Sequence, residues 1–236
     1  MAPVARKPAT NRRDIRNQPA YTVAEAAWYL RMPPATLRSW FAGRSYPTSQ
    51  GSRQWPLIIS PASRNPPLLS FWNLIEAHVL WGLRTDHRVS VREVRHALDY
   101  AQTELRIRRF LLRTELRTAA GRLFLDRYGE LIDLSAAGQL AMREIFAAHL
   151  RRVEWDASNF PIRLYPFLPP ETPSDRRSIT IDAAIAFGRP IVQSRSITTE
   201  VIADRIDAGE AISDVAADYD LSEEEVKEAV VYERAA

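Results

Sequence analysis

The segment from Tyr21 to Arg44, YTVAEAAWYLRMPPATLRSWFAGR, constrains the fold more than any other part of the chain. Thr22 and Glu25, three residues apart, form a capping box that predicts the start of a helix. Met32-Pro33-Pro34 ends this helix, because proline lacks an amide hydrogen and restricts the residue before it. A second helix follows and ends at Gly43. This is the pattern of a helix-turn-helix, whose second helix lies in a DNA major groove.

The two faces of the second helix differ in chemistry. Leu37, Trp40 and Phe41 have helical spacing, and we expect them to be core residues rather than wedges between bases. The outer face carries the base-reading candidates Thr36, Arg38 and Ser39. Arg38 is suited to bidentate contact with guanine, and the alternative is an ordinary solvent-facing arginine.

A strand is expected after the second helix, at Gln54–Ser60, QWPLIIS, within a stretch rich in Ser, Pro and Arg. A strand and loop in this place would make the wing of a winged helix-turn-helix. Arg44 and Arg53, together with Arg64, are the candidates for contacts between the wing and DNA phosphates.

The charge of the chain is strongly divided. Residues 1–110 contain 17 Arg/Lys and 7 Asp/Glu, whereas residues 171–236 contain 7 Arg/Lys and 15 Asp/Glu. A basic half suits a polyanion, and an acidic end suits a basic partner or simply solubility. Nearly all the cations are arginines, which suit phosphate and guanine contacts, although a GC-rich coding bias explains them equally well.

Two further helices are expected at Phe71–Leu83, capped by Ser70, and from Ser90 to about Leu105. Together with Tyr21–Arg44, they resemble the MerR-type winged helix domain, in which two helices brace the recognition helix and wing. Arg106, Arg108 and Arg109 form either a phosphate clamp or an exposed helix end.

The rest of the chain is read as two units. Leu111–Phe167 shows strand alternation, then a helix at 137–152 and an extended segment at 161–167. Pro169–Pro173, PPETP, indicates a linker. Beyond it, three short helices are expected, the first starting at Thr198 or Thr199, the second at Ser213 and the third at Ser222.

The expected fold is mainly α with a small α+β middle: a winged helix-turn-helix, a short antiparallel sheet and a tri-helical C-terminal domain. The predicted divisions are a flexible basic arm (1–18), a DNA-binding domain (19–110), a middle region (111–168), a linker (169–177) and an acidic domain (178–236).

Residues 178–233 are similar to a small domain of unknown function that occurs as the antitoxin beside PIN-like nuclease toxins. The motifs that carry this resemblance are Ile181-Asp182, Gly188-Arg189-Pro190-Ile191, Arg195-Ser196-Ile197-Thr198 and Ala208-Gly209-Glu210. With the N-terminal helix-turn-helix, the whole chain resembles the larger antitoxins of VapBC-type modules. The resemblance implies a homodimer that binds its own operator DNA and neutralises a ribonuclease toxin.

The acidic domain also has a helix-turn-helix shape, but its carboxylates would be repelled by phosphates, so charge favours the first motif as the DNA reader. The acidic domain is then expected to bind the toxin or to form the dimer. It would cover a basic RNA path, or an arginine would enter the nuclease site. The candidate contact residues are Arg189, Arg195, Tyr219 and Tyr232. The alternative function is a stand-alone MerR-like regulator whose middle region senses a ligand or dimerises.

Other classes have little support in the sequence. Without cysteine, disulfides and thiolate metal sites are excluded, and the four histidines lack metal-ligand spacing. Asp126, Glu130 and Asp133 are most simply solvated turn residues. No enzymatic activity, metal or cofactor is therefore expected. No apolar run approaches the ~20 residues of a membrane span, and the cytoplasm is the expected location.

Overall fold

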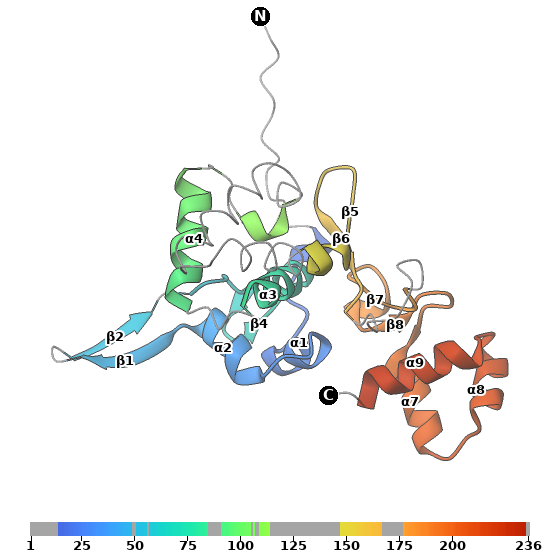
Figure 1. The fold of residues 1–236 in the computed structure, drawn as a ribbon. Helices are drawn as coiled ribbons and strands as arrows, with labels where there is room; N and C mark the ends of the chain where they lie inside the picture. The colour runs from blue at the N-terminus through green and yellow to red at the C-terminus, as the bar shows by residue number, and fades with distance from the viewer. Residues whose placement is uncertain are drawn as a thin grey trace, which may run out of the picture.

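The computed structural model describes residues 14–48, 51–55, 57–84, 91–104, 106, 109–113, 147–166 and 177–234. These residues form a mixed α+β fold (Figure 1). Their strands make three antiparallel sheets, two of them two-stranded hairpins and one with five strands. None of the helices in these ranges is both long and apolar enough to cross a bilayer.

The first helix pair follows the sequence prediction closely. Helix α1 spans Val23–Tyr29 and begins with the capping box, in which the Thr22 amide donates to Glu25 and the Glu25 amide donates to Thr22 Oγ1. The chain turns at Arg31, whose φ is 54°, and helix α2 spans Pro34–Ala42 with proline in its first turn. Proline is favoured there because the first helical amide needs no partner within the helix.

Strands β1, Arg44–Thr48, and β2, Gly51–Trp55, form an antiparallel hairpin directly after α2. The strand predicted at 54–60 is therefore wrong in position, since only its first two residues lie in β2. The backbone amides of Ile58 and Ile59 instead donate to the Trp40 carbonyl, and Ile59 is buried. This apolar segment packs on the end of α2 and is not part of a sheet.

A second short hairpin, β3 at Ser63–Arg64 and β4 at Pro67–Leu68, leads into the central helix. Helix α3 spans Phe71–Arg84, and the Asn73 amide donates to Ser70 Oγ, which confirms the predicted cap. Helix α4 spans Val91–Thr103. The main hydrophobic core gathers Leu37, Trp40, Phe41, Leu74, Ile75, Leu80 and Val94.

The middle region begins differently from the prediction. Phe110–Leu112 form a 3-10 helix, η2, whose three residues are all buried, so the strand expected from Leu111 does not begin there. An alternating strand would bury every second residue. Most of the other strands predicted in this region lie outside the described residues.

The described chain resumes at residue 147, in the last turn of the predicted helix at 137–152. A five-stranded sheet then follows, in the order β5-β6-β7-β8-β9. Its strands are Val153–Trp155, Pro161–Leu164, Ile179–Asp182, Ile191–Val192 and Ile197–Thr198. Strands β6 and β7 flank the predicted linker and pair with each other, Leu164 opposite Ile181. The sheet thus runs without a break from the middle region into the acidic segment.

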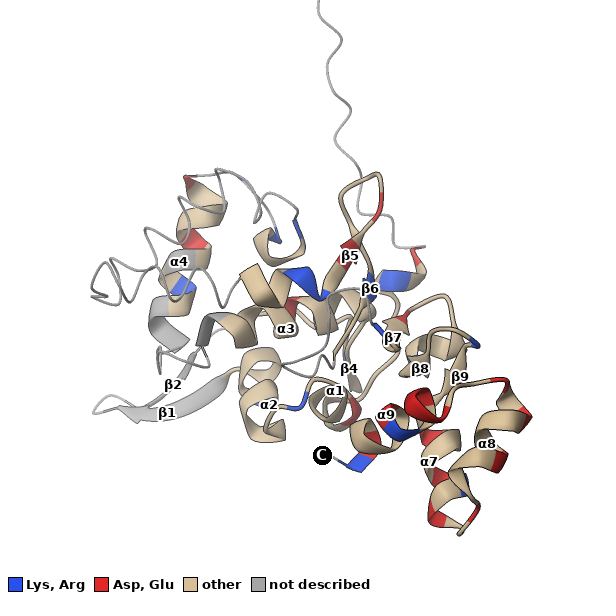
Figure 2. Ribbon diagram, turned by 45° about the vertical axis from the view of Figure 1, so that its right-hand side comes forward, with Lys and Arg blue, Asp and Glu red and all other residues tan. Residues whose placement is uncertain are grey.

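The chain ends in helices α7, Thr199–Asp207, α8, Ile212–Tyr219, and α9, Glu223–Arg234. A second, smaller core includes Val192, Ile202, Val215 and Val226. The Ser222–Glu225 capping box forms as predicted, but α8 begins one residue before Ser213, with no side-chain cap. Acidic residues recur along all three helices (Figure 2).

The start of the described chain is held in place. Ile15–Asn17 form a short 3-10 helix, η1, and Arg16 Nη1 donates to Asp156 Oδ2 at 2.6 Å. The end of the predicted flexible arm is therefore fixed to the β5–β6 turn by this ion pair.

Candidate functional site

Helix α2 separates a buried face from an exposed one. Leu37, Trp40 and Phe41 are buried, with exposed fractions of 4% or less, which confirms their predicted orientation. Arg38 is exposed on the other side of the helix. Within the described part of the chain, no hydrogen bond or ion pair joins the Arg38 side chain to another residue. A long exposed arginine on a rigid helix is available for contact with a second molecule.

The two residues that flank Arg38 are less accessible. Thr36 and Ser39 are both half-buried, and Ser39 Oγ donates to the Thr36 carbonyl at 2.7 Å. The Ser39 hydroxyl is thus already used within its own helix. Arg38 is the one of the three candidates whose side chain projects fully from α2.

The β1–β2 hairpin extends away from the helices (Figure 1). Residue 44 pairs with residue 55, and residue 46 pairs with residue 53. Because opposed residues in an antiparallel pair share a face, positions 44 and 53 fall on the same face of the hairpin. The two candidate wing arginines, Arg44 and Arg53, occupy these positions.

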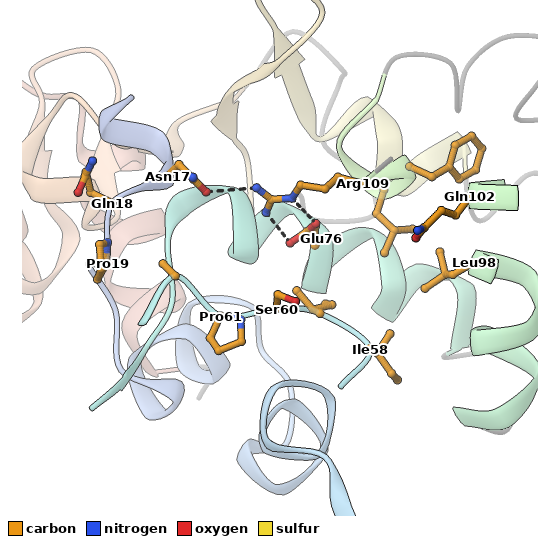
Figure 3. A pocket seen from close by; sticks show the side chains of 14 residues that line it. Asn17, Gln18, Pro19, Ile58, Ser60, Pro61, Glu76, Leu98, Gln102 and Arg109 are labelled. Atoms are coloured by element: carbon orange, nitrogen blue, oxygen red, sulfur yellow. Dashed lines mark hydrogen bonds and ion pairs between the residues drawn. The ribbon is translucent and has the colours of Figure 1, made fainter. Parts of the chain in front are cut away.

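A pocket of about 700 Å³ lies beside the return from the hairpin (Figure 3). Glu76 and Arg109 form a bidentate ion pair on its wall, with nitrogen–oxygen distances of 2.9 and 2.8 Å, and Arg109 Nη1 donates to Asn17. Ile58 and Leu98 add apolar surface. Arg109 therefore holds α3 and the N-terminal segment together, and this contact corresponds to neither of its predicted roles.

The N-terminal helices and the acidic segment are in direct contact. Tyr21 Oη donates to the Gly188 carbonyl at 3.0 Å, and Tyr232 Oη donates to the Tyr29 carbonyl at 3.1 Å. All of these groups are buried, and burial raises the pKa of the Tyr21 and Tyr232 hydroxyls well above the usual range. Both hydroxyls therefore act as neutral donors at any physiological pH.

A cation–π stack reinforces this junction. The Arg31 guanidinium lies 4.3 Å from the centre of the Tyr232 ring and 5.1 Å from that of Trp28. The two rings are themselves 5.9 Å apart in an edge-to-face arrangement. Such contacts between a desolvated cation and aromatic faces contribute about 2 kcal/mol. Helices α1 and α9 are therefore coupled at this point.

A second cleft, of about 600 Å³, lies at the same junction, between α1 and α7. Its lining includes the aromatic side chains Trp28 and Tyr29 and the charged residues Glu25, Arg189, Glu200, Asp204 and Glu233. Half-burial raises the pKa of Glu233, and burial raises that of Tyr29 to about 12. Carboxylates outnumber cations in this cleft, so it suits positively charged groups.

The four residues predicted for toxin or dimer contacts lie in different environments. Arg189 is exposed and lies 3.6 Å from Glu200, and Arg195 is paired with Asp220. Tyr219 is half-buried, with Arg205 5.1 Å above its ring. Tyr232 has no exposed surface, because it packs between α9 and the N-terminal helices of the same chain, where its hydroxyl bonds to the Tyr29 carbonyl. It is therefore not accessible to a second chain. The structure does not gather the four residues into one site.

The described residues contain no group of three or more His, Cys, Asp or Glu side chains that could hold a metal ion. His78 and His149 have ring centres 5.1 Å apart, and burial lowers the pKa of His78 to about 3. His78 is therefore a neutral packing residue.

Two features at the junction were not predicted from the sequence. Phe187 is 92% exposed, although the sequence indicates only a turn there. Tyr21 and Gly188 meet across 167 residues of chain, and no local pattern signals such a pair. The one usable signal is the glycine of Gly188-Arg189-Pro190, which allows a close approach of another group.

Residues 179–232 match a family described as protein of unknown function (DUF433). The chain is 25% identical over 217 residues to the uncharacterized protein Rv2308 of Mycobacterium tuberculosis, a match that covers 90% of this chain and 89% of that protein. The crystal structure of Rv2018 from M. tuberculosis has a similar fold, with a TM-score of 0.65 and 22% identity, over 90% of this chain and 97% of that one. This structural likeness bears on the fold alone.

Proposed function

We propose that this protein is an antitoxin of a type II toxin–antitoxin module, which binds its own operator DNA and neutralises a PIN-like ribonuclease. In this proposal α1, α2 and the β1–β2 hairpin act as a winged helix-turn-helix of MerR type. The acidic segment, in the range that matches DUF433, binds the toxin. The protein acts in the cytoplasm as a homodimer, and neither catalysis nor a cofactor is involved.

One observation carries the DNA-binding half of this proposal. Arg38 extends from the exposed face of α2, and an antiparallel hairpin with arginines at positions 44 and 53 follows directly. A helix that enters the major groove needs a rigid buried face and at least one free side chain that can hydrogen-bond to base edges. The excess of basic residues over 1–110 supplies the attraction for the phosphates.

The test of DNA binding uses the full chain and a DNA duplex from upstream of its own gene. Arg38→Ala should weaken specific binding by about 1–3 kcal/mol, and should change binding to unrelated DNA much less. Arg234→Ala is the matched control, because Arg234 is an exposed arginine on α9 that pairs with Asp207. Equal affinity of the Arg38 variant and the wild type, measured by fluorescence anisotropy, would remove Arg38 from the interface.

The toxin-binding part of the proposal is tested with the product of the adjacent reading frame. If the chain is an antitoxin, it should form a stable complex with that gene product when the two are expressed together. It should also suppress the ribonuclease activity of the gene product. If the two chains migrate separately in size-exclusion chromatography, the antitoxin assignment is wrong.

A second function, a stand-alone regulator that senses a small molecule, is favoured by the pocket of about 700 Å³ in Figure 3. Its wall includes Ile58 and Ile59, whose amides are bonded to the end of α2 at Trp40. A ligand in this pocket would therefore act directly on the DNA-reading helix. A regulator of this kind would bind operator DNA but would not bind the neighbouring gene product.

A further inference from the structure

The side chain of Phe187 is exposed to solvent in a backbone conformation that destabilises the fold. Its side chain is 92% exposed, the largest exposed fraction among the described large hydrophobic residues. Both Ala186 and Phe187 have left-handed backbone conformations, with φ of 46° and 56°. Left-handed residues other than glycine cost about 1–2 kcal/mol each. Neither exposure of a phenyl ring nor this backbone conformation stabilises the chain, so a role outside the fold is the simplest reason for both.

The backbone on either side of Phe187 is fixed. The Gly188 amide donates to the Ile185 carbonyl at 2.8 Å, and the Arg189 amide donates to the Ala186 carbonyl at 3.1 Å. Gly188 and Pro190 are both buried, and the Gly188 carbonyl is held by Tyr21. The ring is therefore presented outward by a rigid turn. A preorganised aromatic residue loses little entropy on binding and is a typical interface anchor.

The cleft that Arg189 lines, two residues after Phe187, is mainly acidic. Arg189 itself pairs with Glu200. Glu25, Asp204 and Glu233 line the same cleft, and within the described residues no Arg or Lys forms an ion pair with them. Helices α7, α8 and α9, which follow directly, carry many further carboxylates (Figure 2). A partner for this surface would combine an apolar pocket with positive charge.

We propose that Phe187, together with the carboxylates of the adjoining cleft, is the docking surface for a basic protein partner. This inference rests on the proposed function, and in that setting the partner is the ribonuclease toxin. An enzyme that cleaves RNA needs a positively charged path for the backbone and surfaces on which bases stack. An acidic surface with a protruding phenyl ring is complementary to such a path in both respects.

The basic N-terminal half of a second copy also has a suitable charge. In that arrangement the acidic end of one chain would contact the basic half of the next. Such a contact produces open chains of subunits unless it closes into a ring or is reciprocated about a twofold axis. A ribonuclease offers a base-stacking surface for the Phe187 ring as well as the positive charge, so a different protein is the favoured occupant.

The experiment measures binding of the adjacent gene product to the full-length protein by isothermal titration calorimetry. Phe187→Ala should weaken binding at least about tenfold, and Phe187→Trp should largely retain it. Val231→Ala is the control, since Val231 is a half-exposed apolar residue (52%) on α9. Binding should also weaken as salt is raised, because the surfaces are oppositely charged. Operator binding, measured in parallel, should not change in the Phe187 variants.

The outcomes separate this inference from the proposed function. If the wild type binds the gene product and Phe187→Ala binds it equally well, the docking surface is wrong while the antitoxin assignment stands. If the wild type does not bind it at all, the antitoxin assignment fails and the inference fails with it. If Phe187→Ala instead lowers the oligomeric state in light scattering, the surface lies between copies of this chain and the proposal is overturned.

Discussion

Gly188 lies in close contact with Tyr21 where the N-terminal helices meet the acidic segment, and Gly188→Ala tests this junction directly. The Cβ atom of an alanine would overlap the Tyr21 hydroxyl and lie about 2.9 Å from Tyr21 Cζ. Gly188 also has a φ of 76°, a conformation that alanine adopts only with strain. The substitution therefore strains the local backbone and also disrupts the contact between Tyr21 and the acidic segment.

The expected cost follows from these two effects. A left-handed alanine costs about 1–2 kcal/mol. Displacement of Tyr21 also breaks the 3.0 Å hydrogen bond to the Gly188 carbonyl and leaves buried polar atoms unpaired, at about 1–3 kcal/mol. Gly188→Ala should therefore lower the free energy of unfolding by about 2–5 kcal/mol. Much of the marginal stability of a typical domain would be lost.

A double-mutant cycle with Tyr21→Phe isolates the contact. Tyr21→Phe alone removes the same hydrogen bond. In the double variant, the alanine at position 188 no longer overlaps a hydroxyl at position 21. The double variant should therefore be more stable than the sum of the two single losses predicts, by at least about 1 kcal/mol. Urea unfolding followed by tryptophan fluorescence measures each free energy. Additive losses, within about 0.5 kcal/mol, would show that Tyr21 and Gly188 do not hold the halves together.

Three further predictions concern charge and backbone strain. Half-burial raises the pKa of Glu233, so its ionisation costs stability once pH exceeds the ordinary glutamate range. Glu233→Gln should therefore be more stable than the wild type in urea at pH 7, with the difference gone below about pH 4; a less stable variant at pH 7 would contradict this. Hydrogen bonds from Arg16 lower the pKa of Asp14. The ionised Asp14 carboxylate therefore stabilises the fold above about pH 4, and this stabilisation is lost as pH falls through the lowered pKa of the folded state. Asp14→Asn should accordingly destabilise the chain at pH 7, and its effect should shrink as pH falls below about 4; a loss of stability that does not change with pH over this range would refute the ion-pair explanation. At position 187, Phe187→Gly should be more stable than Phe187→Ala by about 1 kcal/mol in thermal unfolding, because glycine adopts the left-handed backbone without the strain that alanine incurs; equal stability would show that the turn relaxes at no cost.

The parts of this protein that the sequence determined are those in which interacting groups lie within a few residues of each other. The Thr22–Glu25 and Ser222–Glu225 capping boxes, the turn at Pro33-Pro34 and the buried stripe of Leu37, Trp40 and Phe41 could all be read in advance. Each depends on a hydrogen bond or a spacing inside one helix. The prediction was wrong where an apolar run could either form a strand or pack against a helix. Ile58 and Ile59 were expected in a strand and instead pack on α2.

Only the tertiary structure decided how these elements act together. Tyr21 reaches Gly188 across 167 residues, and Tyr232 reaches Tyr29 across 203. The same packing buries Tyr232, which the sequence marked as a contact for another chain, and leaves Phe187 exposed. Burial is a sum over contacts from distant segments, so local spacing does not encode it. For this reason helix α2 could be recognised from its own residues, whereas the junction beside it could not.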